Sequence, residues 1–296
     1  VYMLMPDRFA NGDLSNDSIA GMLQKADRSN MEARHGGDLA GVQMHLDYLQ
    51  DLGITALWLN PELENDQPRA SYHGYAVTNH YLVDRRFGSN EQYRQLVSEC
   101  HRRGIKMIRD VVLNHIGSNH YWMKDLPTKD WLNQWPAYTN TSFRAPTILD
   151  PYASEYDKKM FNDGWFDVDM PDLNQRNPHV ANYLIQQAIW WTEYAGLDGF
   201  RIDTYTYSDQ AFMSKWCAAV RKEYPNMAMF GEIWEQGVVV QGFFADNQPM
   251  ARANFDSNLP GVIDFQMCFA IQEALTREQG WTEGIARVYY TLAQDY

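Results

Sequence analysis

The stretch Gly199-Phe200-Arg201-Ile202-Asp203 completes a short apolar run, Leu197–Ile202, and closes it with a carboxylate. The run follows Val180–Tyr194, in which apolar residues recur with the period of an amphipathic helix. A short apolar run directly after a helix is typical of a parallel sheet, because parallel strands need a crossover between them. The stretch therefore predicts one strand–helix repeat of an α/β fold.

The same alternation extends in both directions from this repeat. Five further apolar runs are predicted as strands: Val1–Met5, Ile54–Leu59, Ile105–Leu113, Met227–Phe230 and Val262–Phe265. Helices are predicted at Gly41–Leu52, at Asn90–Arg103 and in a tail that reaches Tyr296. Six strand–helix units in series favour a barrel or a doubly wound sheet.

Two long segments interrupt this pattern. Asp7–Asp38 is rich in Asn, Asp, Ser and Gly, and His115–Asn177 carries scattered Trp, Pro and Asp. Connections of this length are uncommon in compact domains and are usually functional or form a small inserted domain. Each follows the C-terminal end of a predicted strand, so both are expected on the active-site side of a barrel.

The composition limits the classes of partner. Among 296 residues, 25 Lys and Arg stand against 38 Asp and Glu, which gives a net charge of −13. Such a chain repels the phosphate backbone, so no nucleic-acid partner is expected. Mean hydropathy is −0.51 and no apolar run reaches about 18 residues, so no membrane partner is expected. Ten Trp and 18 Tyr are compatible with a sugar ligand, although aromatic residues also fill large cores.

Three of the predicted strands end in polar residues. Arg201 and Asp203 lie two residues apart, so they share one face of their strand. Glu232 closes the next run, so Asp203 and Glu232 are expected at the ends of adjacent parallel strands, facing one cavity. The third polar end contains Asp110 and, beyond it, His115.

Two carboxylates that face one cavity are the pair that glycoside hydrolysis uses, one as nucleophile and one as proton donor. Arg201 would keep Asp203 ionised through charge pairing. A single acid at a strand end is more often a surface or capping residue, but three polar strand ends together favour a catalytic site. The residues alone therefore predict a glycosidase-type site around Asp203 and Glu232.

Five segments of the sequence carry a family resemblance, in matching order and spacing. They are Asp110-Val111-Val112-Leu113-Asn114-His115, Gly199-Phe200-Arg201-Ile202-Asp203, Gly231-Glu232-Ile233-Trp234, Met5-Pro6-Asp7-Arg8-Phe9-Ala10-Asn11-Gly12-Asp13 and Met170-Pro171-Asp172-Leu173-Asn174. The first three resemble signature regions of the α-amylase family of glycoside hydrolases. The last two look like its neopullulanase and cyclomaltodextrinase branch.

The resemblance implies a (β/α)8 TIM-type barrel with a small inserted domain after the third strand. The catalytic barrel would comprise residues 1–114 and 178–296, and the inserted domain residues 115–177. By matching motif positions, Asp203 would be the nucleophile, Glu232 the general acid/base, and Arg201 the residue that orients Asp203.

The resemblance also implies contacts to the substrate. His115 would hydrogen-bond the sugar in the cleaved subsite, and Tyr75 would stack on the same sugar. Asp110 would brace the site from below, although a buried acid that only holds backbone fits this position equally well. Trp234, two residues after the expected acid/base, is counted with the substrate-binding residues.

A metal site is expected in the first long segment. Asn11, Asp13, Asn16 and Asp17 supply four oxygen-bearing side chains within seven residues. Ca²⁺ takes six to eight oxygen ligands, but Asp and Asn clusters are more often solvated turns. The branch that the sequence resembles places calcium on the matching loop, with a carbonyl and an Asp from a segment that corresponds to Gly36-Gly37-Asp38. The resemblance therefore favours structural Ca²⁺, with Gly36 and Asp38 among its ligands.

Several positions depart from the family pattern. Thr206 and Tyr207 stand where α-amylases proper carry a Lys-His pair, which argues against a plain endo-acting α-amylase. Glu235 stands where close relatives often have His, and Asp172 where many neopullulanases have Lys. The preference between α-1,4 and α-1,6 bonds, and among maltodextrins, cyclodextrins and pullulan, stays open.

The function expected from these observations is that of a retaining α-glucan hydrolase that acts through a covalent glycosyl-enzyme. An oligo-1,6-glucosidase or a transglycosylase would use the same site. A non-catalytic carbohydrate-binding or partner-binding subunit is the alternative from another class, and it would be expected to lack one of the two carboxylates. The expected partner is an α-glucan oligosaccharide, with a homodimer considered for the full-length protein. A periplasmic location is expected, with the cytoplasm as the alternative.

One motif of the family is not found. The third catalytic carboxylate belongs to an Asn-His-Asp motif on the seventh strand, and no such motif follows Val262–Phe265. Strands seven and eight and the N-terminal β-domain of the branch are not recognised either. We expect about six strands in an open sheet, an exposed apolar patch along its edge, and no activity from these 296 residues alone.

Overall fold

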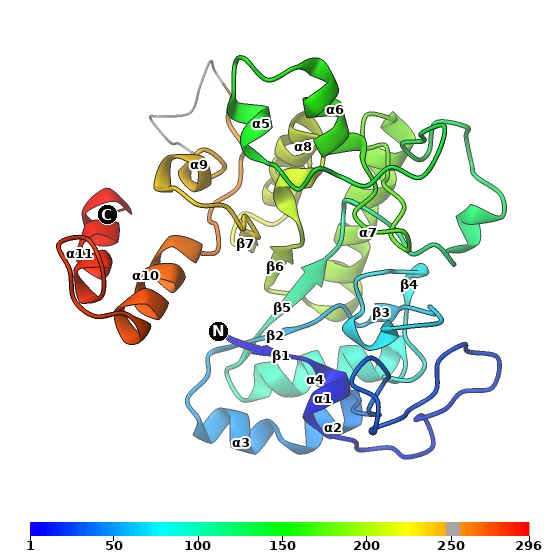
Figure 1. Ribbon diagram of the computed structural model, residues 1–296. Coiled ribbons are helices and arrows are strands. Elements are labelled where there is room, and N and C mark those ends of the chain that lie inside the picture. The colour runs from blue at the N-terminus through cyan, green and yellow to red at the C-terminus, as the bar shows by residue number, and fades with distance from the viewer. Residues whose placement is uncertain (247–254, 296) are drawn as a thin grey trace.

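The computed structural model describes residues 1–246 and 255–295, and its centre is a parallel sheet of five strands (Figure 1). The strands are β1 (Tyr2–Leu4), β2 (Ala56–Leu59), β5 (Lys106–Val111), β6 (Gly199–Ile202) and β7 (Ala228–Gly231). They lie in the order β1-β2-β5-β6-β7, so each new strand joins the same edge of the sheet. The expected α/β class is confirmed.

Helices follow the strands in the alternation that the sequence predicts. The α-helices are α1 (Pro6–Phe9), α2 (Leu39–Met44), α3 (Leu46–Asp51), α4 (Asn90–Arg102), α5 (Pro146–Leu149), α6 (Glu155–Asp163), α7 (Pro178–Ala195), α8 (Gln210–Glu223), α9 (Val238–Gly242), α10 (Phe265–Thr276) and α11 (Ile285–Asp295). Helix α2 packs against α4, α4 against α7, and α7 against α8, in the same order as the strands (Figure 1). This matched order of strands and helices is that of the predicted TIM-type barrel.

The sequence chemistry explains where the longest helix begins and ends. Asn177 caps α7 by accepting from the backbone N–H of His179, and Pro178 occupies the first turn, where a missing N–H costs nothing. Gly196 ends the helix with φ of +78°, a left-handed conformation that glycine adopts without strain. The chain can therefore turn directly into β6.

The hydrophobic core lies between the sheet and these helices. Phe200 of β6 and Trp216 of α8 are fully buried and meet edge to face, with ring centroids 5.5 Å apart. Gly199 is required beside them, because a Cβ there would lie 2.9 Å from the Ala228 carbonyl oxygen of β7. Strand β6 is buried at every position, so its end is held firmly.

The structure departs from the predicted elements in three places. The helix expected at Gly41–Leu52 is two helices, α2 and α3, which meet at His45. The strand expected at Val262–Phe265 is a single bridge from Val262 to Gly231, because Phe265 already begins α10 under an Asp264 cap. The sequence pattern missed a two-stranded antiparallel sheet, β3 (Leu63–Glu64) with β4 (Asn79–Val83).

In the described part of the chain the sheet is open, with β1 and β7 at its edges. Met3 of β1 is 49% exposed, and helices α10 and α11 pack mainly on each other, beyond β7 (Figure 1). The open sheet that the sequence led us to expect is thus observed. No helix among the described residues has the length and apolar character needed to cross a bilayer.

The two long segments lie where the sequence predicts them. The first follows β1 and contains only α1 before α2 begins. The second runs from β5 to α7 and contains the 3₁₀ turn η2 (Tyr121–Met123) and the short helices α5 and α6. Two further 3₁₀ turns, η1 (Ser71–His73) and η3 (Tyr205–Tyr207), follow β3 and β6. The boundary of the inserted domain at residues 115–177 stays a prediction.

Candidate active site

A single guanidinium, that of Arg201, connects three carboxylates at the C-terminal end of the sheet. Its Nη1 lies 2.7 Å from Asp203 Oδ1 and 2.9 Å from Asp110 Oδ1, and its Nη2 lies 2.5 Å from Glu232 Oε1. The first three of these residues are more than nine-tenths buried, while Glu232 is partly open to solvent. Asp203 and Glu232 thus lie within the reach of one side chain, as predicted.

The strand register produces this cluster. Asp110 of β5 pairs directly with Arg201 of β6, and Asp203 and Glu232 follow the ends of β6 and β7. The backbone N–H of Glu232 donates to the Ile202 carbonyl oxygen at 2.9 Å, which holds it against β6. Polar residues that follow parallel strands share one edge of the sheet, which is where barrel enzymes hold their active sites.

The turn after Asp203 holds Glu232 in place. Thr204 has φ of +43°, a left-handed conformation that is strained for a β-branched residue. In this conformation its backbone N–H donates to Glu232 Oε2 at 3.0 Å, and its hydroxyl donates to Asp203 Oδ2 at 3.2 Å. One strained residue therefore contacts both carboxylates.

Asp110 lies beneath Arg201 and does not line the pocket onto which Asp203 and Glu232 open. Its Oδ2 accepts from the indole N–H of Trp58 at 3.0 Å and from the hydroxyl of Tyr75 at 3.1 Å. The Arg201 guanidinium also lies over the Trp58 ring, 5.2 Å from its centroid. The structure thus places Asp110 where it supports Arg201, without direct access to a substrate, and the sequence pattern gave no indication of Trp58.

Burial and mutual repulsion make the acids of this cluster harder to ionise. Burial raises the pKa of Asp110 to about 7, with Arg201 opposing the shift and Asp203 adding to it. Burial also raises the pKa of Asp203 against the pull of Arg201. The pKa of Glu232 is raised by burial and then by the charge of Asp203.

The pocket above the cluster has a volume of about 440 Å³, within the range of small-molecule sites. Its lining brings together most of the residues predicted from the sequence: Tyr75, His115, Arg201, Asp203, Glu232 and Trp234. Asp203 and Glu232 are the only carboxylates among the described residues that line it. The structure therefore gathers residues from the ends of β5, β6 and β7, together with Tyr75 from the connection between η1 and β4, around one cavity.

His115 presents an unpartnered ring nitrogen to this pocket. The side chain is buried, its Nε2 has no partner, and its ring stacks on Phe166 with centroids 5.3 Å apart. Burial lowers the pKa of His115 to about 4, so the ring is neutral at physiological pH and can act as a hydrogen-bond donor. This arrangement fits the predicted contact to a sugar hydroxyl.

The turn at Gly74 aims Tyr75 into the pocket. Gly74 has φ of +85°, and a Cβ there would lie 2.1 Å from the Pro61 carbonyl oxygen, so no other residue fits. Tyr75 stacks on His73, with ring centroids 5.7 Å apart, while its hydroxyl reaches Asp110. Its aromatic face is thus fixed beside the catalytic cluster.

Aromatic residues that the sequence pattern did not single out complete the pocket. Phe166 and Tyr207 are these residues, and they meet edge to face at 5.3 Å. Trp234, which the sequence predicted, stacks on Phe265 at 5.0 Å while remaining 67% exposed. Tyr207 drew attention only as a departure from the family pattern, and Phe166 lies in the long segment, where no periodicity marks it.

The residues expected to bind metal converge in part. Asn11 Nδ2 donates to Asp17 Oδ1 at 2.6 Å, and Gly36 lies against both side chains. The side-chain oxygens of Asn11 and Asn16 are buried without a partner. Asn11, Asp17 and Gly36 therefore lie together, which brings part of the predicted ligand set to one place.

Two of the expected metal ligands have other partners. Asp38 Oδ1 accepts from the N–H groups of Gly12 and Gly41, and its Oδ2 accepts from the N–H of Asp13 and the amide of Asn16. Asp38 therefore organises the loop and caps α2. Asp13 Oδ1 accepts from the backbone and hydroxyl of Ser15. No cluster of three or more His, Cys, Asp or Glu side chains suited to a metal occurs within residues 1–246 and 255–295.

Comparisons with known proteins agree with this geometry. The family described as alpha amylase, catalytic domain, matches residues 3–276. A cyclomaltodextrinase of Thermoanaerobacter pseudethanolicus is 32% identical over 280 residues, which covers 90% of this chain and 44% of that protein. Neopullulanase 2 of Thermoactinomyces vulgaris is 36% identical over 244 residues, covering 79% of this chain and 38% of that protein.

Comparison with solved structures also identifies α-amylases. The crystal structure of an Anoxybacillus α-amylase superimposes with a TM-score of 0.81 at 29% identity, covering 99% of this chain and 57% of the other. The chain spans less than half the length of the two curated relatives described above. A family match across nearly all of the sequence, a shared fold and a paired-carboxylate site agree, and the chain belongs to the α-amylase catalytic-domain family.

Proposed function

We propose that this protein is a retaining α-glucan hydrolase, with Asp203 as nucleophile and Glu232 as general acid/base. The observation that carries the proposal is the contact of both carboxylates with Arg201 at the ends of neighbouring strands. Retaining glycosidases need two carboxyl groups about 5–5.5 Å apart, on opposite sides of the bond that is cleaved. Contact with one guanidinium keeps the two carboxyl groups close together, which supports a retaining mechanism.

The reaction would proceed in two steps. In the first, Glu232 protonates the glycosidic oxygen while Asp203 attacks the anomeric carbon, which forms a glycosyl ester on Asp203 and releases the leaving sugar. In the second, Glu232 removes a proton from water, which attacks the same carbon and frees Asp203. Arg201 supports the nucleophile by favouring its ionised form.

The substrate class is proposed from the pocket and from the relatives. Tyr75, Phe166 and Trp234 offer aromatic surface, and His115 offers a neutral donor, which suits an uncharged sugar. The relatives are named cyclomaltodextrinase and neopullulanase, which supports maltodextrins, cyclodextrins and pullulan as the substrates to test. Cleavage of α-1,4 bonds is the first expectation.

We also infer a structural Ca²⁺ at the loop after β1. Unpartnered, buried oxygens of Asn11 and Asn16 beside the Asp17 carboxylate support this assignment, since Ca²⁺ prefers such ligands. When bound, the ion would supply charge that balances Asp17 and would tie the loop to Gly36. The chain's own part is to hold these oxygens together, which Asp38 does through its four N–H contacts.

Substitution of the two carboxylates in the full-length enzyme tests the proposal. Asp203→Asn should lower kcat on maltodextrin by about 10⁴-fold or more while sugar binding persists, because the nucleophile is lost and the shape is kept. Glu232→Gln should cost about 10²- to 10⁴-fold. Asp198→Asn, at the opposite end of β6, is the matched control and should retain activity. Near-normal turnover by Asp203→Asn would refute the assignment.

A further inference from the structure

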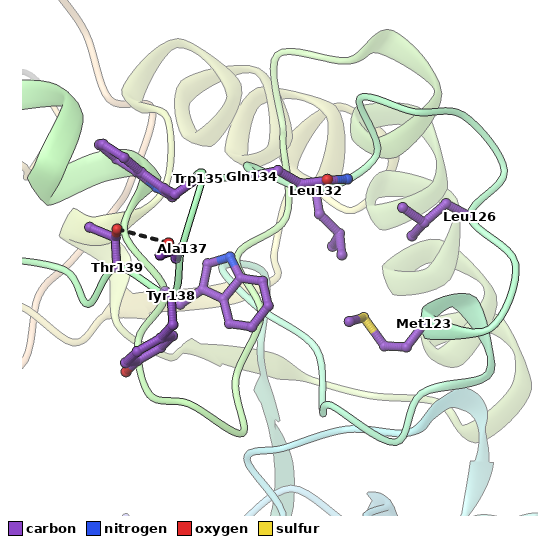
Figure 2. Close-up of a pocket in the computed structure, with 9 residues that line it drawn as sticks. Met123, Leu126, Leu132, Gln134, Trp135, Ala137, Tyr138 and Thr139 are labelled. Atoms are coloured by element: carbon purple, nitrogen blue, oxygen red, sulfur yellow. Dashed lines mark hydrogen bonds between the residues drawn. The ribbon is translucent and has the colours of Figure 1, made fainter.

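The segment between β5 and α7 contains a second cavity, of about 350 Å³ (Figure 2). Its lining shares no residue with the catalytic pocket. In Figure 2, Met123 and Leu126 lie on one side of the hollow, and Tyr138 and Thr139 on the other. The volume lies within the range of sites that hold small molecules.

Aromatic side chains of fixed orientation form part of this cavity. Tyr138 and Trp165 meet edge to face with centroids 6.0 Å apart, and Tyr138 is 49% exposed. The indole N–H of Trp165 donates to the Asn133 carbonyl oxygen at 2.9 Å, and that of Trp135 donates to the Asp163 carbonyl oxygen at 2.8 Å. Because both indoles are anchored through their N–H groups, little side-chain entropy would be lost when a ligand packs on them.

The residues that line the second cavity are uncharged, which favours an uncharged ligand. None of the nine described residues around the cavity is Asp, Glu, Lys or Arg, although the whole chain carries a net charge of −13. Gln134, Tyr138 and Thr139 add neutral amide and hydroxyl groups to the aromatic surface. Although the Lys159 ammonium lies over the Trp135 ring at 4.8 Å, the lining itself offers what a sugar needs, which is aromatic faces and neutral hydrogen-bonding groups.

The cavity adjoins the catalytic pocket through two consecutive residues. Trp165 lines the second cavity and forms a bridge with Asn140, while Phe166 lines the catalytic pocket and stacks on His115. Neighbouring side chains in an extended segment point to opposite sides. A long polymer held at one site would therefore keep its other units close to the second.

We propose that this cavity is a second α-glucan binding site, which holds long chains beside the catalytic pocket. The inference depends on the proposed substrate class and extends it by assigning a preference for long chains. A chain long enough to occupy both sites gains affinity from the second, whereas a short oligosaccharide such as maltotriose that is held in the catalytic pocket gains none. The site therefore acts through effective concentration.

Binding to amylopectin measured by gel retardation tests the inference, in an Asp203→Asn background of the full-length protein, in which cleavage is slowest. Tyr138→Ala should raise the Kd for amylopectin by about five- to tenfold, as the loss of an aromatic anchor does elsewhere. Met123→Trp, which fills the cavity, should have the same effect. Tyr152→Ala removes an aromatic side chain that is 93% exposed in the same segment and lies outside both pockets, so it should bind as the parent does.

Kinetics of the otherwise unmodified enzyme provide the second measurement. Tyr138→Ala should raise KM for amylose and leave kcat/KM for maltotriose unchanged. Parent-like retardation of either folded cavity variant would overturn the second site, as would an equal loss on amylose and maltotriose. If the enzyme cleaves no α-glucan but the retardation differences persist, the proposed reaction fails and the binding site stands.

Discussion

The balance of charge around Arg201 explains much of the chemistry of the catalytic pocket. Three carboxylates contact one guanidinium, so full ionisation would leave an excess of negative charge in a buried place. Such a cluster retains protons that water would remove. Asp110 is the most enclosed of the three, and Trp58 and Tyr75 donate hydrogen bonds to it from below.

The pH dependence of stability tests this account of Asp110. Burial raises the pKa of Asp110 from 3.8 to about 7, so the folded chain keeps a proton that the unfolded chain has released. The stability due to this proton is complete below about pH 4 and is lost as the pH rises to 7, at up to about 1.4 kcal/mol per pH unit. Asp110→Asn cannot ionise, so its free energy of unfolding should decline less than that of the wild type between pH 4.5 and 7.

Denaturant titrations at several pH values provide this measurement. Asp51→Asn, which removes an exposed carboxylate from α3, is the control and should parallel the wild type. If Asp110→Asn and the wild type lose stability in parallel over this range, Asp110 does not hold the proton.

At the scale of elements, the sequence predicts the strands of the main sheet and most of the residues that the strand ends bring together. Apolar runs identify all five strands of the main sheet, because buried parallel strands are nearly continuous in apolar residues. The polar ends of β5, β6 and β7 therefore predict the catalytic cluster. The pattern fails where elements are too short to show a period, as in β3 and at the single bridge of Val262.

Sequence patterns do not predict the contacts that irregular segments make, and the reason is physical. Phe166 and Tyr207 meet only because the segment between β5 and α7 folds back over η3. Trp58 reaches Asp110 because β2 lies next to β5 in the sheet. In the sequence, Trp58 is one apolar residue among the others of its predicted strand, and nothing there indicates this contact. Long-range packing, which no local period encodes, places these side chains.

At the scale of elements, the testable prediction concerns Ca²⁺ binding by the loop after β1. If Ca²⁺ joins Asn11, Asn16, Asp17 and Gly36, its removal by a chelator should lower the Tm by several degrees, because binding stabilises only the folded loop. Asp17→Ala should show the lower Tm without chelator and no further change with it. Calorimetry with and without added Ca²⁺ measures both effects, and Tm values that do not respond to chelator would identify the loop as a polar turn.

At the scale of the whole molecule, the sheet places the candidate chemistry at one end. Strand order and helix order agree along the described chain, so the successive ends of β5, β6 and β7 contribute His115, Asp203 and Glu232 to a common pocket, which Tyr75 joins from the connection before β4. The long segment after β5 covers this pocket and contains the second cavity. Catalysis and the holding of long chains would thus depend on a single inserted segment.

The central claim is that Asp203 forms a covalent bond to the sugar, and trapping this intermediate tests the claim most directly. The full-length enzyme is incubated with a fluorinated α-glucosyl fluoride, which slows release of the glycosyl-enzyme, and the digested protein is mapped by mass spectrometry. The account predicts one added glycosyl group, located on the peptide that contains Asp203, and none in Asp203→Asn. A label on another residue, or an active enzyme that inverts the anomeric configuration without forming an adduct, would contradict it.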